Sequence, residues 1–369
     1  MPGFDTDESV PLRFLCDAGR PAAGRSAGED GGSETMRMRT GLFLAVLLAV
    51  VMSAGCGGPA KESSKGEGGR QLKVALLSPG PVNDGGWNQL GYQGLLLVEK
   101  ELGARVNQKQ TESPADFEGD FREYASQGYD VIIGHGFELQ PAAIKVSKEF
   151  PDTVFVITAG SKVEGKVVPI IPKLEEATYL LGVIAARMSK TGKAGLVGGM
   201  EIPPIKSTFE AFRKGALSVN PQFKVSASFI GNWEDTAAAK EATRALIQQG
   251  CDFIFHNADA AGRGVFEACR EARGVYAFGS NSDQNGIAPD VILASAVLEI
   301  PRTFVEICQS VQDGTFQPRE YELTVANGHT SLVINPRLKD VIPQKVLDEI
   351  EDLKEQLRSG RLKVERAHF

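Results

Sequence analysis

The sequence predicts an α/β fold with two Rossmann-like lobes joined by a hinge. From Leu72 onward, short runs rich in β-branched and apolar residues alternate with stretches of helical periodicity. Most of the short runs are almost continuously apolar, as parallel strands covered on both faces must be. The alternation then repeats with units of similar size. These three observations indicate two doubly wound parallel sheets with right-handed crossovers, one in each lobe.

The first series of elements forms the first lobe. Its strands are expected at residues 73–78, 104–110, 131–134 and 154–159, and its helices at 87–102, 116–127 and 141–150. The second series forms the second lobe. Its helices are expected at residues 175–189, 207–218, 236–249 and 264–272, and its strands at 194–198, 224–230, 253–257 and 275–279. Each helix has the length that a crossover between parallel strands requires.

The elements after residue 290 are too few for a third domain. They are a strand at 291–297, a helix at 301–312, mixed strand at 321–334 and a charged amphipathic helix at 343–358. We expect these elements to thread back between the lobes. The expected boundaries are residues 72–172 plus about 297–325 for lobe I, and residues 173–296 plus about 326–369 for lobe II.

Residues 36–55 have the features of an export signal. Arg37 and Arg39 precede a short apolar run at 41–52, and small residues then lead to Cys56. The Ser-Ala-Gly before Cys56 resembles a bacterial lipobox, with serine where leucine is usual. We expect lipidation of Cys56, which would hold the protein outside the cytoplasm on a bacterial membrane, on its periplasmic side or at the cell surface. An uncleaved membrane anchor with a chance cysteine is the alternative.

The segments on either side of the signal differ in composition. Residues 56–71 are rich in Gly, Ser, Lys and Glu, which predicts a flexible tether. Residues 1–35 show no periodicity. Because signal peptides begin close to their positive residues, and Met36 and Met38 stand there, we expect that residues 1–35 either are not translated or are disordered.

Composition and charge exclude several function classes. The chain has a formal net charge of −7 and no basic cluster interleaved with aromatic residues, which argues against nucleic-acid binding. Its four histidines have no metal-ligand spacing, and the sequence contains no Gly-x-Ser-x-Gly elbow. We therefore expect no enzyme, no metal and no cofactor.

Three cysteines lie in the predicted globular part, at Cys251, Cys269 and Cys308. No Cys-x-x-Cys motif joins them. They are either three small buried residues or, in an exported protein, one disulfide pair and one free thiol.

The loops that follow the strands hold the candidate ligand-binding residues. In a doubly wound sheet, ligands bind at the carboxyl ends of the strands. The first such loop contains Asp84, placed to cap a helix, and Trp87, an indole with little structural purpose at a helix start. The second contains Gly136 and Phe137. The alternatives are that Asp84 only caps, that Trp87 packs inward, and that Phe137 is a core residue after a tight turn.

The second lobe supplies a similar set of loops. Trp233 lies in the loop after the strand at 224–230, and Asn257 ends the next strand. Asn281 and Asp283 follow the strand after that. Aromatic rings with amides and carboxylates at their edges favour a flat polar heterocycle as ligand. Asp283 would suit sugar hydroxyls or a purine N–H. Neither Gly-x-x-x-x-Gly-Lys-Ser/Thr nor Gly-x-Gly-x-x-Gly occurs, so nucleotides are not expected.

Taken together, these motifs resemble those of the basic membrane protein family of ABC-transporter substrate-binding lipoproteins, which includes purine-nucleoside and purine-base binders. The resemblance covers about residues 72–335. The segments that carry it are residues 83–88, 134–137, 177–186, 231–235, 250–256, 282–284 and 293–297.

The resemblance implies a type I periplasmic-binding-protein fold, a two-lobed clamshell. It implies that Trp87 stacks on the purine, with Asn88 and Asp84 at polar positions of the same motif. Phe209 is the nearest match to a second stacking aromatic, and Asp283 matches the residue that holds ribose. The chain departs from nucleoside binders in two ways. Leu298 replaces a common lysine, and the first-loop aromatic is tryptophan rather than phenylalanine, which leaves room for a free base.

The predicted function is the extracytoplasmic receptor of an ABC importer for a purine nucleoside or base. Its partners would be an ABC permease, a separate ATPase subunit and, through the lipid anchor, a membrane. We expect a monomer. Two alternatives remain open: a protein of a different class, a sensor lipoprotein that signals to a membrane partner, and an uptake receptor for another small polar ligand. An enzyme such as a nucleoside hydrolase is the third.

Overall fold

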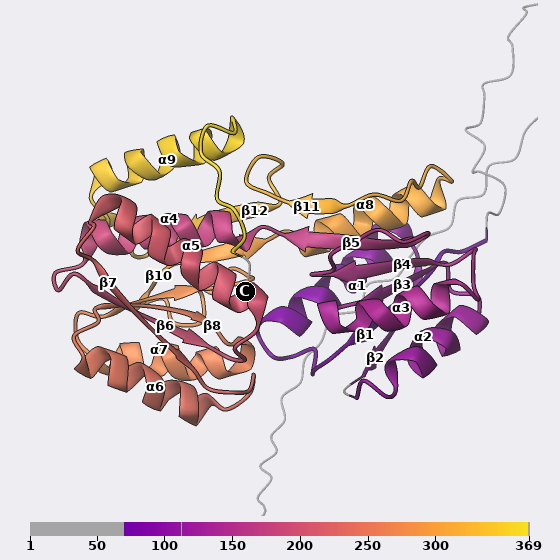
Figure 1. The fold of residues 1–369 in the computed structure, drawn as a ribbon, viewed down its shortest axis with the longest axis horizontal. Helices are drawn as coiled ribbons and strands as arrows, with labels where there is room; N and C mark the ends of the chain where they lie inside the picture. Colours follow the sequence, from indigo (N-terminus) through magenta and orange to yellow (C-terminus); the bar gives the residue numbers. More distant parts are fainter. Residues whose placement is uncertain (1–69, 112, 368–369) are drawn as a thin grey trace, which may run out of the picture. The chain divides into compact units, whose positions relative to one another are not determined.

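The structure is a computed structural model, and it describes residues 70–111 and 113–367. The predicted signal peptide, the segment before it and the predicted lipidation site at Cys56 lie outside the described residues. In the described part, two six-stranded sheets each carry helices on both faces (Figure 1).

The first sheet is entirely parallel and has the order β11-β5-β4-β3-β1-β2. Its strands are β1 (Lys73–Ser78), β2 (Arg105–Gln110), β3 (Val131–Gly134), β4 (Val154–Thr158), β5 (Val167–Pro172) and β11 (Tyr321–Leu323). Its helices are α1 (Trp87–Leu102), α2 (Phe117–Ser126), α3 (Gln140–Ser147) and α8 (Ile300–Gln312), with the short η1 (Phe137–Leu139) before α3. We call this unit lobe I.

Strand β1 is buried on both faces, which explains why its sequence is apolar at successive positions. Val74 and Leu76 belong to the buried cluster that contains residues of α1 and α8, whereas Ala75 and Leu77 belong to the cluster with residues of α2 and α3. Successive side chains of a strand point to opposite faces, so a strand covered on both sides buries all of them.

The second sheet has the order β12-β10-β9-β8-β6-β7 and is parallel except for β12, which pairs antiparallel with β10. Its strands are β6 (Lys193–Gly198), β7 (Lys224–Phe229), β8 (Phe253–Asn257), β9 (Tyr276–Gly279), β10 (Ile292–Leu298) and β12 (Thr330–Ile334). Its helices are α4 (Leu174–Met188), α5 (Pro203–Val219), α6 (Thr236–Gln248), α7 (Gly262–Glu271) and α9 (Gln344–Arg358), with short η2 (Asp259–Ala261) and η3 (Lys339–Val341). We call this unit lobe II.

Two glycines allow α4 and α5 to pack closely in lobe II. A Cβ atom at Gly182 would lie 2.0 Å from the Phe212 carbonyl oxygen, and one at Gly215 would lie 2.0 Å from the Tyr179 carbonyl oxygen. Since no side chain fits at either position, the two backbones touch. This contact packs α4 against α5, and residues at the start of both helices line the cavity described below.

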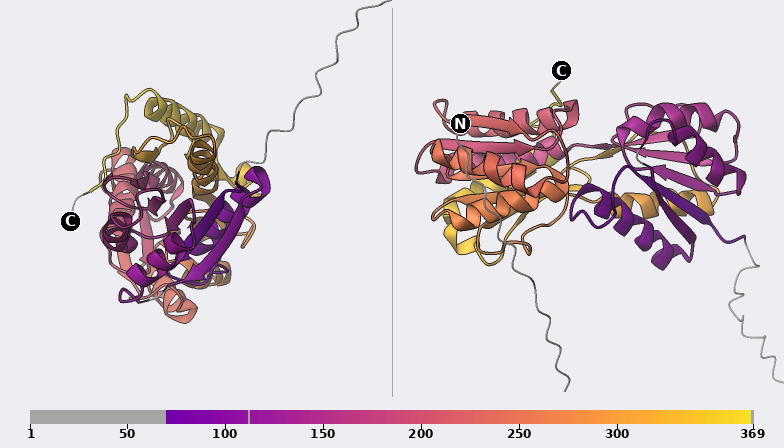
Figure 2. Two further views of the ribbon diagram at one scale, coloured as in Figure 1. Left: turned by 90° about the vertical axis from the view of Figure 1, so that its right-hand side faces the viewer. Right: turned by 90° about the horizontal axis from the view of Figure 1, so that it is seen from below.

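Three chain segments connect the lobes, and hydrogen bonds tie them together. They lie between β5 and α4, between β10 and α8, and between β11 and β12. Lys173 N donates to Leu323 O at 2.9 Å, and Glu299 N donates to His329 O at 2.8 Å. The right-hand view of Figure 2 shows these segments passing between the two sheets. The connection is therefore a hinge of three segments, in which the segment between β11 and β12 is hydrogen-bonded to each of the other two.

The predicted helices and strands are present, with two differences. The sequence missed β5, because Pro169 and Pro172 argue against a strand that is paired on both sides. The mixed strand expected at 321–334 is two strands in different sheets, β11 in lobe I and β12 in lobe II. The three cysteines of the described part are free, buried thiols, so no disulfide joins them.

Candidate ligand-binding site

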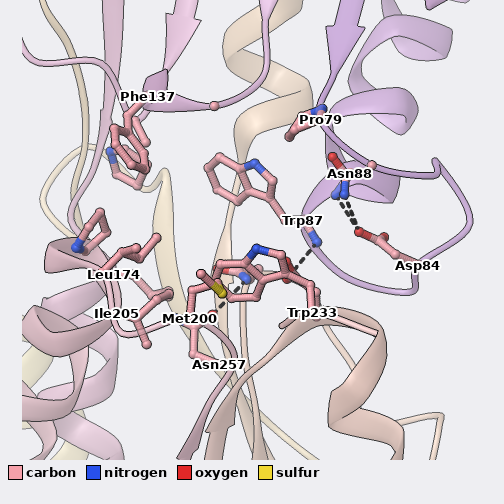
Figure 3. A pocket seen from close by; sticks show the side chains of 18 of the residues that line it. Pro79, Asp84, Trp87, Asn88, Phe137, Leu174, Met200, Ile205, Trp233 and Asn257 are labelled. Carbon is pink, nitrogen blue, oxygen red and sulfur yellow. Dashed lines mark hydrogen bonds between the residues drawn. The ribbon is translucent and has the colours of Figure 1, made fainter. Parts of the chain in front are cut away.

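A cavity of about 440 Å³ lies where the carboxyl ends of the strands of both lobes meet. Lobe I contributes residues that follow β1, β3 and β4, and lobe II contributes residues that follow β6, β7, β8 and β9. Figure 3 shows side chains from both lobes around this space. The predicted candidates that line it are Asp84, Trp87, Asn88, Gly136, Phe137, Trp233, Asn257 and Asn281.

Asp84 shapes the loop after β1 and has no free oxygen for a ligand. Its carboxylate accepts from the backbone N–H groups of Gly86, Asn88 and Gln89 and from Asn88 Nδ2, each at 2.9 Å. Two of these donors, Asn88 N and Gln89 N, belong to the first turn of α1, where N–H groups lack partners within the helix. The N-cap residue is Gly86 rather than the expected Asp84, and the Asp84 carboxylate binds the start of the helix from two residues before the cap. Its role at the cavity is to position its neighbours.

Asn88 presents an unused acceptor. Its Nδ2 faces Asp84, which can only accept, so the amide orientation is fixed with Oδ1 on the other side. Asn88 Oδ1 is buried and has no hydrogen-bond partner among the described residues. A buried acceptor without a donor is costly, so a ligand N–H or O–H at this point would stabilise the site.

His135, the residue that follows β3, fixes the position of the Trp87 indole. The two rings stack with centroids 4.4 Å apart and an interplanar angle of 20°. Trp87 Nε1 donates to His135 O at 3.2 Å, and His135 Nε2 lies 2.7 Å from Trp87 O. Since a carbonyl only accepts, Nε2 carries the proton and Nδ1 accepts from the Thr158 hydroxyl at 2.9 Å.

Burial keeps this histidine neutral. His135 is fully buried, and the resulting desolvation lowers the pKa of its imidazole to about 4. The imidazole covers one face of the Trp87 indole, and the indole projects into the cavity (Figure 3). The alternative that Trp87 packs wholly inward is therefore wrong, because its ring forms part of the cavity wall.

The segment after His135 adds an aromatic ring and a carboxyl to the wall. Phe137 is 43% exposed and lines the cavity, so it is not a core residue. Glu138, which the sequence analysis did not single out, lines it as well. Although the Glu138 residue as a whole is exposed, desolvation of its carboxyl at the wall raises its pKa.

Lobe II supplies a second indole and a pair of amides. The Trp233 ring packs against Gly199, where a Cβ atom would lie 2.2 Å from the ring. Asn257 and Asn281 are buried, and Asn281 Nδ2 donates to Asn257 Oδ1 at 3.3 Å. Both tryptophans of the chain thus lie at this cavity, one from each lobe.

Two candidate residues lie elsewhere. Phe209 is buried in the core of lobe II, stacked on Phe229 at 5.4 Å, and is not part of the cavity wall. On the same helix Ile205 and Thr208 face the cavity, so Phe209 falls on the side turned to the sheet. Asp283 is exposed and outside the wall, and its carboxylate accepts from Asn285 N at 3.0 Å in a local turn.

The lobes also touch directly beside the cavity. Trp87 N donates to Asp259 Oδ1 at 3.3 Å, and Gln284 Nε2 donates to Gly85 O at 3.2 Å. Desolvation, with a smaller contribution from the charge of Asp84, raises the pKa of Asp259 to about 7. A carboxyl from lobe II therefore meets the first turn of α1 in lobe I.

The wall also holds an ion pair that the sequence analysis missed. Glu175, at the start of α4, is 1% exposed and bonds Arg366 through Oε1 at 2.8 Å. Glu175 and Glu176 lie in the first turn of α4, where the helix dipole favours carboxylates whether or not they have a partner. Nothing in the sequence indicates a contact between residues so far apart along the chain.

The residues of the described part contain no group of three or more His, Cys, Asp or Glu placed to hold a metal ion. None of the described helices is long and apolar enough to cross a membrane.

A family model described as an ABC transporter substrate-binding protein, PnrA-like, matches residues 71–365. The chain belongs to this family. The resemblance to the basic membrane protein family is thus confirmed. The PnrA-like family is one of substrate-binding proteins rather than enzymes.

The relatives and structures similar to this PnrA-like protein agree with that placement. A purine-binding protein of Brucella abortus (strain 2308) is 30% identical over 86% of this chain and 88% of its own. The nucleoside-binding protein BmpA of an ABC transporter in Lactococcus lactis is 29% identical over 76% of this chain and 87% of its own. A solute-binding protein from Aeropyrum pernix K1 has a TM-score of 0.74 at 22% identity, covering 81% of this chain and 95% of that one. The predicted type I periplasmic-binding-protein fold is confirmed.

Replacing Asp259 by asparagine should flatten the pH dependence of stability. Between about pH 4 and pH 7 the folded protein retains a proton on Asp259 that the unfolded chain has released, so the free energy of unfolding falls as pH rises. The loss in the wild type should be on the order of 2 kcal/mol, because the residue is only partly shielded from solvent. Urea denaturation across this pH window measures the effect in both proteins.

Asp290→Asn is the control for that experiment. Arg270 lowers the pKa of Asp290, so above about pH 5 this carboxyl is ionised in both states and its loss should leave the slope from there to pH 7 unchanged. Equal slopes in the wild type and the Asp259→Asn variant would contradict the assignment.

Proposed function

We propose that this protein is the lipid-anchored, extracytoplasmic receptor of an ABC importer that takes up purine bases or purine nucleosides. The observation that carries the proposal is the indole of Trp87, fixed by His135 with one face toward the cavity, beside the unpartnered Asn88 Oδ1. A rigid ring next to a hydrogen-bond acceptor suits a flat heterocycle that carries N–H groups. The names of the relatives from Brucella abortus and Lactococcus lactis support a purine ligand.

The wall of the cavity favours a free base over a nucleoside. Asp283, which the family resemblance assigns to ribose, is outside the wall. Leu298, where nucleoside binders commonly have lysine, lines it and offers no donor to sugar hydroxyls. The cavity wall therefore offers more groups suited to a purine ring than to a ribose. A volume of about 440 Å³ lies within the range of small-molecule sites.

The two-lobed architecture supports a role in transport. A ligand that contacts both lobes binds the closed arrangement more tightly than the open one, so it shifts the population toward closure. The closed form then docks on a membrane permease, and a separate ATPase subunit supplies the energy. Lipidation of Cys56, followed by the tether to residue 71, would keep the receptor at the membrane.

A thermal-shift panel tests the ligand class. The panel contains adenine, hypoxanthine, guanine, adenosine, inosine, guanosine, cytidine, ribose and a branched-chain amino acid. A ligand at about 100 times its dissociation constant stabilises the protein by about 2.7 kcal/mol. We expect shifts with purines alone, larger for bases than for nucleosides. Stabilisation by ribose or the amino acid, with none by any purine, would contradict the proposal.

Trp87→Ala should weaken purine binding by about 1–3 kcal/mol, because one stacked ring is lost. Trp87→Phe should retain most of the affinity, since a ring still covers the ligand. Isothermal titration calorimetry measures both variants. Phe150→Ala, outside the cavity wall, is the control for non-specific loss of packing. Unchanged affinity in Trp87→Ala would remove the indole from the site.

Cys56→Ala should release the protein from the membrane. In cells labelled with a radioactive fatty acid, the wild type should carry label and fractionate with membranes, whereas the variant should be unlabelled because the acceptor thiol is missing. Cys251→Ala, a buried thiol of the folded part, should retain the label. Equal labelling of the Cys56 variant and the wild type would show that the protein is not lipidated at Cys56.

A further inference from the structure

The segment that follows α9 returns to the ligand cavity. Arg366 Nε donates to Glu175 Oε1 at 2.8 Å, and Arg366 Nη2 donates to Pro172 O at 2.5 Å. Ala367 N donates to Ser207 Oγ at 2.9 Å. The segment is thereby fastened to the end of β5 in lobe I and to the starts of α4 and α5 in lobe II. Both Arg366 and Glu175 line the cavity.

Glu175 has one oxygen without a partner. The residue is 1% exposed, and Arg366 occupies Oε1. Oε2 is buried and accepts no hydrogen bond from any described residue. A carboxylate oxygen in this situation has lost its water without gaining a donor, which is costly unless a donor arrives from elsewhere. The neighbouring cavity is where such a donor would come from.

The Arg366 guanidinium has more N–H donors than its two hydrogen bonds use. A guanidinium carries five N–H donors in a planar fork, and the bonds to Glu175 and Pro172 O use two of them. The side chain is 29% exposed, so part of it remains open to the cavity side. The pair therefore offers an acceptor, Glu175 Oε2, next to remaining donors of Arg366.

We propose that Glu175 and Arg366 form a specificity-determining pair that binds the polar edge of the ligand, where a donor lies beside an acceptor. The inference rests on the proposed function and specifies how the purine ring is recognised. Hypoxanthine presents N1–H beside the O6 carbonyl, and adenine presents its 6-amino group beside N1. In each base the donor meets Glu175 Oε2 and the acceptor meets the Arg366 guanidinium. The segment after α9 is thus part of the binding site.

Two pairs of bases test the donor contact by isothermal titration calorimetry. Hypoxanthine is compared with 1-methylhypoxanthine, and adenine with N6,N6-dimethyladenine, because each methylated base lacks the N–H that Glu175 would accept. The wild-type protein should bind at least one unmethylated base about tenfold or more tightly than its partner. In Glu175→Gln the amide oxygen can still accept the hydrogen bond from Arg366, but the amide N–H2 group then stands at the position of Oε2 and donates instead of accepting. The ratio of the dissociation constants of the methylated and unmethylated base should then fall toward one.

Arg366→Lys tests the other half of the pair and keeps the charge beside Glu175. This substitution should weaken binding of the unmethylated base about tenfold. An ammonium lacks the planar fork of the guanidinium and cannot donate to Glu175, Pro172 O and the ligand in the same geometry. Arg361→Ala, on the same segment and bonded to Ser359 Oγ, is the matched control and should bind like the wild type. Thermal unfolding without ligand shows that each variant is folded.

The outcomes separate this inference from the proposed function. A preference for the unmethylated base that disappears in Glu175→Gln supports the pair as a reader of the ligand edge. An unchanged preference in Glu175→Gln, or equal binding of both bases of each pair by the wild type, overturns it and leaves a water molecule as the partner of Oε2. Absence of any purine binding by the wild type overturns the proposed function together with this inference.

Discussion

The candidate site depends on the reciprocal contact between Trp87 and His135. Each residue donates one hydrogen bond to the backbone carbonyl of the other, and their rings stack. The contact joins the loop after β1 to the loop after β3 and fixes the indole plane. Gly91 makes room for it, since a Cβ atom there would lie 2.8 Å from the imidazole. Phe304 of α8 meets the other side of the imidazole edge-on at 6.2 Å.

The same residue also connects the two lobes. Trp87 N donates to Asp259 Oδ1, so the first turn of α1 in lobe I contacts lobe II beside the stacked rings of Trp87 and His135. On the opposite side of the cavity, Arg366 spans the end of β5 and the start of α4, which is one of the three connections between the lobes. A ligand between these points would contact groups that connect the two lobes.

The sequence predicts the fold well because apolar strands and amphipathic helices are local signals. It also brings Trp87, Phe137 and Asn257 to one cavity, since loops after parallel strands converge at one edge of the sheet. It fails where local signals conflict or are missing. Two prolines in β5 argue against a strand, so the sequence did not predict it. Phe209 was expected to stack on the ligand by resemblance alone, but its position on α5 directs its side chain into the core. The pair of Glu175 and Arg366 joins residues 191 positions apart, which no local pattern reveals.

A crystal structure of the protein with the purine that binds most tightly tests this binding site most directly. The purine ring should lie parallel to the Trp87 indole, on the face opposite His135, with an N–H group directed at Asn88 Oδ1 or Glu175 Oε2. A purine bound elsewhere, with Trp87 and His135 separated or the indole uncovered, would contradict the claim that this pair of residues builds the binding site.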